Sequence, residues 1–471
     1  MLNFLFISNF FTYFLSSFQL FDLNGFSFAY NNLILVFFFF FALKKIFWDG
    51  DKITLPVNEV TISMLILFIA IWFSAYNPIS QGNPDYLTQY FKTNAHLYFV
   101  MIFALFNLVF PIEEKVWVNA IRTFLICMLI INIFGVYQLF ARLYDLPFAW
   151  IDITNVTADA RTKDVEGTAN QLALKFEDFY RATSIFSEPS ILAQYNLISL
   201  IFLITPLING TKKFINSKIF NFLYLVSSLV ALLFAFSLNG FFGLGLLGTS
   251  AFIFQKKINI KPLNFIVSLV LVAIMFIAAD TIVKDLTQVS IFDLTYSRIS
   301  SIIGGKANSI DVINGESYFD RANNGMNGIK AWLIHPYFGT GLGLAYTSKV
   351  SELPFLEFSS ISMLLETGLF GFSAYISFML ILTFKALTLK NKLEFKSESE
   401  METNLSTIIF YVMILELYIN FFTAGWFINE SFWHYVALIF WLISNETRRN
   451  NLNAIEIRIL KTPLKNILFM K

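Results

Sequence analysis

Residues 219–254 read IFNFLYLVSSLVALLFAFSLNGFFGLGLLGTSAFIF, and this run settles the architecture of the chain. A membrane-spanning helix needs about 20 mostly apolar residues, so the run is long enough for two spans. Lys218 precedes it, and Lys256 and Lys257 follow it. Because basic loops collect on the cytoplasmic side, both ends belong there and the run must turn back on itself. The polar residues at 237–240 (SLNG) supply the turn.

The rest of the composition agrees with a protein built in a membrane. The chain has 471 residues, of which 56% are hydrophobic and 14% are charged, and its mean hydropathy is +0.65. Soluble domains carry about 25% charged residues. The net charge of +1 gives no bulk attraction to nucleic acid, so we expect no nucleic-acid partner. Cys127 is the single cysteine and cannot form an internal disulfide.

Hydropathy predicts an all-α polytopic membrane protein with about twelve transmembrane helices. The first apolar stretch lacks a basic leader and a clear cleavage site, so we interpret it as the first span rather than a signal peptide. The expected spans are 2–21, 28–43, 58–76, 95–110, 117–140, 188–208, 219–236, 240–254, 262–279, 360–384, 405–422 and 430–444.

Basic residues follow every even-numbered span, which predicts that both termini are cytoplasmic. Two long segments of mixed charge then lie outside, and loops of this length inside a compact protein are usually functional. The tail is polar and basic, and we interpret it as a surface-associated helix or a partly disordered segment. The chain therefore divides into helices 1–5 (1–140), a first large outer loop (141–187), helices 6–9 (188–279), a second large outer loop (280–359), helices 10–12 (360–444) and a cytoplasmic tail (445–471).

The arginines are placed against the positive-inside trend. The inner loops use mainly lysine, whereas both outer segments contain arginine: Arg142, Arg161, Arg181, Arg298 and Arg321. A guanidinium group binds phosphate or carboxylate through two parallel hydrogen bonds, so this placement indicates an anionic ligand on the outer face. Ordinary salt bridges with the many acids of the same loops are the alternative.

A second group of polar residues stands where the sixth expected span begins, in the order Ser187-Glu188-Pro189-Ser190. Ser187 can cap this helix, and Pro189 suits its first turn. This local role explains the sequence completely. In the functional alternative, Glu188 faces a cavity beside Arg181 and orients an acceptor hydroxyl as a general base.

The third group joins the second outer loop to the tenth expected span. His335-Pro336-Tyr337-Phe338 leads into a turn with glycines at 339, 341 and 343, and Glu366 follows just inside the span with Gly368 and Gly371 behind it. The glycines permit tight turns and close approach of the backbone to a ligand. No lysine with serine or threonine follows, so this is no Walker loop. Glu366 either lines a cavity or is solvated at the interface.

These blocks together resemble the O-antigen polymerase (Wzy-type) and O-antigen ligase superfamily. The resemblance rests on Arg181 with residues 187–190 (SEPS), on His335-Pro336 with the glycine turn, and on the block Glu366-x-Gly368-Leu369-x-Gly371. It implies a metal-independent glycosyltransferase of the GT-C-like fold in the bacterial inner membrane, with its two large loops periplasmic. It also implies a substrate carried on undecaprenyl pyrophosphate, no cofactor, contact with membrane lipid and a polysaccharide chain-length regulator as a partner.

The resemblance assigns roles to ten residues. The catalytic candidates are Glu188, His335, Glu357 and Glu366. The residues expected to bind the substrate or its pyrophosphate are Arg181, Arg298, Arg321, Tyr337, Gly339 and Gly341.

One departure separates the members of the superfamily. Ligases and many relatives carry a His-Asn pair upstream of the Glu-x-Gly block, and Glu357-Phe358 stands in that place here. We therefore expect a polymerase that joins lipid-linked repeat units, with a ligase acting on lipid A core as the alternative. A polysaccharide flippase or transporter is a second alternative, and an outer-surface assembly protein is a third. The general base stays open among Glu357, Glu188 and His335.

Overall fold

The computed structural model describes most of the chain as helix. The described residues are 1–154, 171, 175–176, 179–254, 325–345, 359–396, 399–422, 430–450 and 454–457, without 24–25, 50–52 and 111, together with scattered residues between 274 and 296. They form two compact units. Unit 1 contains Met1–Tyr13, Asn31–Ala120 and Asn323–Lys471, and unit 2 contains Phe14–Tyr30 and Ile121–Ala322.

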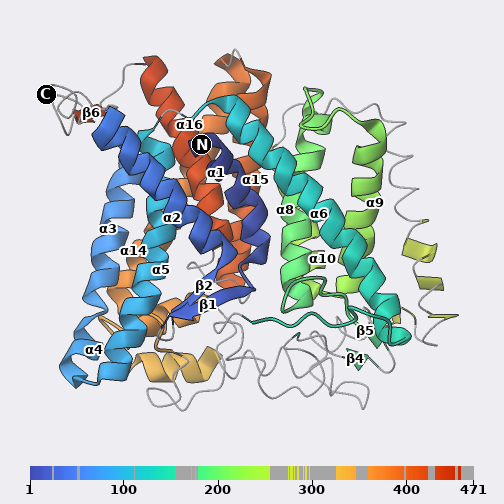
Figure 1. Ribbon diagram of the computed structural model, residues 1–471, viewed down its shortest axis with the longest axis horizontal. Coiled ribbons are helices and arrows are strands. Elements are labelled where there is room, and N and C mark those ends of the chain that lie inside the picture. The colour runs from blue at the N-terminus through green and yellow to red at the C-terminus, as the bar shows by residue number, and fades with distance from the viewer. Residues whose placement is uncertain are drawn as a thin grey trace, which may run out of the picture. The chain divides into compact units, whose positions relative to one another are not determined.

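Unit 1 holds most of the long helices (Figure 1). α14 packs against α3 and α15, and α16 packs against α5 and α15. Buried residues lie all round α15 and α16, as expected for helices in the interior of a bundle. Its elements are α1 (Leu2–Thr12), α2 (Tyr30–Leu43), η2 (Lys44–Asp49), β3 (Ile53–Pro56), α3 (Glu59–Phe73), α4 (Tyr76–Gln81), α5 (Pro84–Val109), α14 (Ser359–Lys396), α15 (Glu400–Phe422), α16 (Glu430–Asn450) and β6 (Ala454–Ile457).

Local sequence signals fix where several of these helices begin. Asn58 accepts hydrogen bonds from the backbone N–H groups of Val60 and Thr61, and the Thr61 hydroxyl accepts from the N–H of Asn58, which completes a capping box before α3. Asn83 caps α5, and Pro84 occupies its first turn, where a missing N–H costs nothing. The polar residues between the apolar runs therefore set the helix ends.

Unit 2 is built on helices α8, α9 and α10. α8 packs against both α9 and α10, and residues 219–254 divide between these last two helices, as the basic flanks of the run predict. Phe236 takes the left-handed conformation at the turn, with φ 49°. The elements here are η1 (Tyr13–Leu15), β1 (Gln19–Leu23), β2 (Phe26–Ala29), α6 (Glu114–Leu143, which begins in unit 1), β4 (Lys175–Phe176), β5 (Phe179–Tyr180), α8 (Pro189–Asn209), α9 (Lys218–Ala235) and α10 (Leu238–Phe254).

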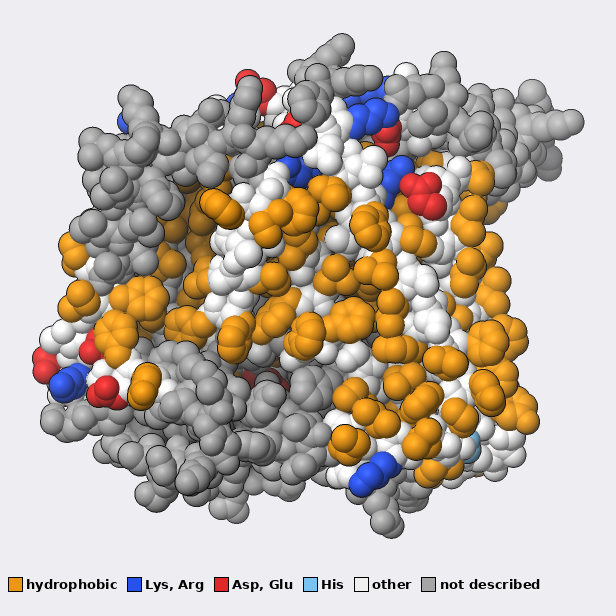
Figure 2. Space-filling model, turned by 180° about the vertical axis from the view of Figure 1, so that it is seen from behind, with side chains coloured by type: hydrophobic (Ala, Val, Ile, Leu, Met, Phe, Trp, Pro, Cys, Tyr) orange, Lys and Arg blue, Asp and Glu red, His pale blue; other side chains and the backbone are white. Residues whose placement is uncertain are grey.

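The polytopic membrane class is confirmed. Among the described residues, 8 helical segments are long and apolar enough to cross a membrane, and two shorter apolar helices cover Leu2–Leu15 and Asn239–Phe254. In Figure 2, hydrophobic side chains cover most of the described surface, and the described charged side chains gather towards its two ends. α3 illustrates the pattern, because Ile62, Leu65 and Ile69 are each about half exposed, as suits contact with lipid.

Two boundaries differ from the sequence expectation. The first span, expected over 2–21, ends as a helix by Leu15, and Gln19–Leu23 pairs with Phe26–Ala29 in an antiparallel hairpin. The tail is also different, since α16 continues to Asn450 and Ala454–Ile457 forms a strand against Ile53–Pro56 rather than a surface helix. Residues 262–273 of the expected ninth span lie outside the described part of the chain.

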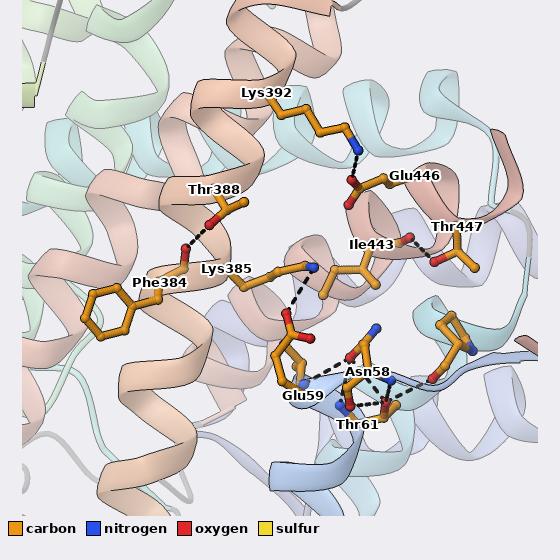
Figure 3. Close-up of polar contacts among 12 residues, drawn as sticks. Asn58, Glu59, Thr61, Phe384, Lys385, Thr388, Lys392, Ile443, Glu446 and Thr447 are labelled. Carbon is orange, nitrogen blue, oxygen red and sulfur yellow. Dashed lines mark hydrogen bonds and ion pairs between the residues drawn. The ribbon is translucent and has the colours of Figure 1, made fainter. Parts of the chain in front are cut away.

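Ion pairs join the helix ends at which unit 1 carries its basic residues (Figure 3). Lys385 of α14 pairs with Glu59 of α3 at 3.1 Å, and Lys392 pairs with Glu446 of α16. Orientation by basic loops assigns all four residues to the same side of the membrane, and the pairing agrees with that assignment.

Candidate functional site

The glycine turn after His335 is docked into a break in α14. Gly368 interrupts this helix with φ 64° and ψ −169°, so the backbone groups on either side of it lack their helical partners. Residues 336–341 replace them. Thr340 N–H and Gly341 N–H donate to the carbonyls of Leu365 and Glu366, each at 2.9 Å.

The exchange runs in the other direction as well. Leu369 N–H donates to the carbonyl of Pro336 at 2.8 Å, and Phe370 N–H donates to that of Tyr337 at 3.2 Å. The backbone N–H and carbonyl groups of the broken helix and of the turn therefore pair with each other. Such pairing is what permits irregular backbone within a membrane protein.

Only glycine fits at the two points of closest approach. Gly339 has φ 72°, and a Cβ there would overlap the carbonyl of Glu366. A Cβ on Gly368 would overlap the carbonyl of Tyr337. The glycines thus serve backbone-to-backbone packing.

This geometry revises the binding role expected for Gly339 and Gly341. Gly339 N–H donates to the carbonyl of His335 at 3.0 Å, and Gly341 N–H donates to that of Glu366. Both backbone N–H groups therefore already donate to carbonyls of the protein and are not available to bind a pyrophosphate. The side chain of Asn77 donates to the carbonyl of Gly339, which fastens the turn to α4.

Glu366 lies at the centre of this arrangement, in α14 just before the break. Its side chain is fully buried, so it is not a carboxylate solvated at the interface. Oε1 accepts a hydrogen bond from Ala345 N–H at 3.3 Å. Oε2 has no hydrogen-bond partner among the described residues. A buried carboxylate oxygen left without a donor is costly, and such groups within membrane helices are usually functional.

The other predicted residues of the turn lie at its surface. His335 is half-buried, and its N–H donates to the carbonyl of Trp332 at 2.9 Å. Tyr337 keeps 63% of its surface exposed, which leaves its ring accessible to a ligand. Phe338 instead stacks on Phe73 and Phe370, with ring centroids 5.9 and 5.8 Å away. Aromatic packing of Phe338 therefore fixes the turn, while the side chain of Tyr337 stays exposed.

The first outer segment is organised around Arg142 of unit 2. This guanidinium is buried and donates to the carbonyls of Ala149 and Arg181 at 2.9 and 2.6 Å. It also donates to the oxygen atoms of Gln171 and Thr183, at 3.0 and 2.7 Å. None of these four acceptors is a carboxylate, so Arg142 does not form the salt bridge expected within its loop. Its guanidinium is also occupied by these bonds, which does not fit the expected binding of an anionic ligand.

Gln171 is the polar residue that the sequence argument missed. Its amide nitrogen donates to the carbonyls of Ser184 and Phe186 at 2.8 and 2.9 Å, while its oxygen accepts from Arg142. The pair bridges residues on both sides of the first outer segment. A lone glutamine in a long polar loop carries no periodicity or motif, so no signal in the sequence could have identified it.

Arg181 and Glu188 stand in the same unit, next to this network. Arg181 is half-buried, and its carbonyl is one of the acceptors of Arg142. Glu188, not Ser187, is the N-cap residue of α8, and Pro189 takes the first helical position as expected. The Glu188 carboxylate accepts a hydrogen bond from the hydroxyl of Ser190 at 3.0 Å.

Three predicted site residues cannot be placed, because Arg298, Arg321 and Glu357 lie outside the described residues. Glu416, the other intramembrane acid seen in the sequence, does find a polar partner. Asn420 donates to it at 3.0 Å and accepts from the hydroxyl of Tyr375 on α14 at 2.7 Å. In the described part of the chain, no group of three or more His, Cys, Asp or Glu side chains is placed to hold a metal ion.

The fold and these clusters define a class, a multi-helix membrane protein with buried polar groups inside its helical units. No protein-family model and no curated protein matches the chain.

Proposed function

We propose that the protein polymerises oligosaccharide repeat units carried on undecaprenyl pyrophosphate, at the outer face of the bacterial inner membrane. The observation that carries the proposal is the break in α14, where a buried carboxylate with one unpartnered oxygen sits against a polar turn. A buried carboxylate destabilises a membrane helix bundle, so its presence favours a role in catalysis or ligand binding. The outer arginines and the motif resemblance supply the substrate class.

The proposed reaction needs no activation step inside the protein. The acceptor hydroxyl attacks the anomeric carbon of the donor, the bond from that carbon to the pyrophosphate oxygen breaks, and undecaprenyl pyrophosphate leaves. A carboxylate takes the hydroxyl proton, and a cation neutralises the leaving charge. In unit 2, Glu188 is the described carboxylate assigned to the first role and Arg181 is the described cation assigned to the second. In unit 1, Glu366 is the other described carboxylate assigned to the first role.

A ligase that transfers the finished chain to lipid A core would use the same chemistry. The two activities differ in their acceptor. A cell that lacks the polymerase keeps core carrying a single repeat, whereas a cell that lacks the ligase keeps bare core. Deletion of the gene followed by lipopolysaccharide analysis therefore distinguishes them.

One observation favours a transporter as a second candidate. Broken membrane helices with polar groups at the break are typical of transporters, and α14 is broken at Gly368. A transporter would move the lipid-linked unit across a vesicle membrane without joining two units. Purified protein in vesicles answers the question, since polymerisation yields products longer than the supplied unit and transport does not.

The side chain of Arg181 offers a direct test of the enzyme. Arg181→Ala removes the guanidinium but keeps the carbonyl that Arg142 binds, so the segment should stay folded. We expect long-chain polysaccharide to disappear from cells while the protein remains in the membrane. The same result is expected for Arg321→Ala. Wild-type chain length in both variants would overturn the assignment.

A further inference from the structure

A second buried carboxylate of unit 1 lies at the start of α16, and the proposed function does not use it. Glu430 is 5% exposed. The side-chain amide of Asn31, on α2, donates to its Oε2. His96 Nε2, on α5, lies 3.9 Å from its Oε1, which is beyond hydrogen-bond distance. Within the described residues no lysine or arginine pairs with Glu430.

Asn31 binds the carboxyl group of Glu430 without balancing a charge on it. Its side chain is fully buried, and its Oδ1 has no hydrogen-bond partner among the described residues. The amide is neutral, so its hydrogen bond to Glu430 supplies no positive charge to balance an ionised carboxylate.

His434 lies one helical turn further along α16 and is buried. Its Nδ1 lies 2.7 Å from the carbonyl of Glu430, which can only accept, so Nδ1 carries the hydrogen. Its Nε2 lies 2.7 Å from the side-chain amide of Asn9. The rings of Phe10 and Phe103 surround it, with centroids 4.9 and 5.0 Å away. Burial among aromatic rings disfavours a charged imidazolium, so His434 does not balance an ionised Glu430.

Three titratable groups of the described residues lie close to Glu430 or to His434. They are Tyr13 of η1, whose ring lies 5.1 Å from that of His434, His96 of α5, and His434 itself on α16. Among these, His96 is the group through which a proton could be exchanged. Its side chain is 37% exposed, against 6% for that of Glu430.

We propose that Glu430, Asn31 and His96 form a binding site for one proton, held on the carboxyl group of Glu430. The proton comes from water through the imidazole of His96 and neutralises the carboxylate, and no other bond changes. The start of α16 favours a negative charge, but this effect is weaker than the cost of burying a carboxylate without a cation. The site links α2, α5 and α16 and is independent of the proposed polymerase reaction.

Infrared difference spectroscopy of the purified protein at neutral pH tests the site directly. The wild-type minus Glu430→Gln spectrum should contain the carbonyl band of a protonated acid, and this band should shift in D2O. Glu59→Gln is the control, because Glu59 pairs with Lys385 and its side chain is 58% exposed, so only ionised carboxylate absorption should be lost. Loss of ionised carboxylate absorption in Glu430→Gln as well would overturn the proposal.

Two further measurements keep the proposal testable if Glu430→Gln does not accumulate. Asn31→Leu removes the amide but keeps the carboxyl, so the acid carbonyl band should move rather than vanish. An unmoved band would contradict the contact with Asn31. In thermal unfolding, a site that binds a proton only in the folded protein makes the folded state less stable as pH rises. The ratio of folded to unfolded protein should fall by up to tenfold per pH unit. His96→Gln should keep this dependence, and a wild type whose unfolding is insensitive to pH would count against the site.

Discussion

Replacing Arg142 by methionine should destabilise the first outer segment severely. Methionine keeps a long apolar side chain but removes all four hydrogen bonds that the guanidinium donates. The oxygen atom of Gln171 still accepts from the N–H of Ile151. The carbonyls of Ala149 and Arg181 both lose the guanidinium as a donor, and Ala149 is buried.

The size of the effect follows from these contacts. Loss of the donor costs about 1–3 kcal/mol for each carbonyl. The guanidinium also lies 4.1 Å from the centre of the Trp150 ring, a contact worth roughly 1–2 kcal/mol when it is shielded from water. Because these terms share one side chain and do not add fully, we expect a loss of about 3–5 kcal/mol. That is a large part of the roughly 5–15 kcal/mol that stabilises a folded domain.

Denaturant unfolding and limited proteolysis of the purified protein measure this loss. Arg181→Met is the matched control, since it removes a neighbouring guanidinium and leaves the carbonyl that Arg142 binds. It should cost less than about 1 kcal/mol. The reasoning is refuted if Arg142→Met stays within about 1 kcal/mol of the wild type, or if Arg181→Met loses as much.

Three further changes test other parts of the account. Gly368→Ala should destabilise unit 1 by about 2–4 kcal/mol in thermal unfolding, through strain and overlap with the turn, whereas Gly245→Ala, which has open space, should be neutral or gain up to about 1 kcal/mol. Glu366→Gln keeps an acceptor for Ala345 N–H, so the protein should fold normally, yet polymerisation should fall by at least about 100-fold. Lys385→Ala breaks a partly exposed ion pair with Glu59 and should lower the free energy of unfolding by less than about 1 kcal/mol. A larger loss would show that this pair contributes substantially to holding α14 against α3.

Hydropathy and basic flanks predicted much of the helical framework. The division of residues 219–254 into α9 and α10 follows from length and charge alone, because a single span would leave the two basic ends on opposite sides. The early end of the first span could not be found in this way. The β-hairpin of Gln19–Leu23 and Phe26–Ala29 is apolar enough to continue a hydropathy run, and pairing between strands is invisible to a composition window.

Several residues of the candidate site stood out in the sequence, but the contacts that they make did not. The glycines of the turn were expected to approach a ligand. Gly339 approaches the backbone of α14, Gly341 the side chain of Pro78 and Gly343 that of Thr93. Glu366 was noticed because an acid inside an apolar run stands out. Asn31 and His434 were not given a role, since each gains its significance from contacts with residues hundreds of positions away in the sequence.

The central claim is that this protein joins lipid-linked repeat units. Its most direct test is to incubate the purified protein with a defined undecaprenyl-pyrophosphate repeat unit, with and without a metal chelator, and to separate the products by length. We expect a ladder of longer chains that forms equally well with chelator and is absent with Glu366→Gln. Recovery of only the supplied unit from folded, wild-type protein would contradict the claim.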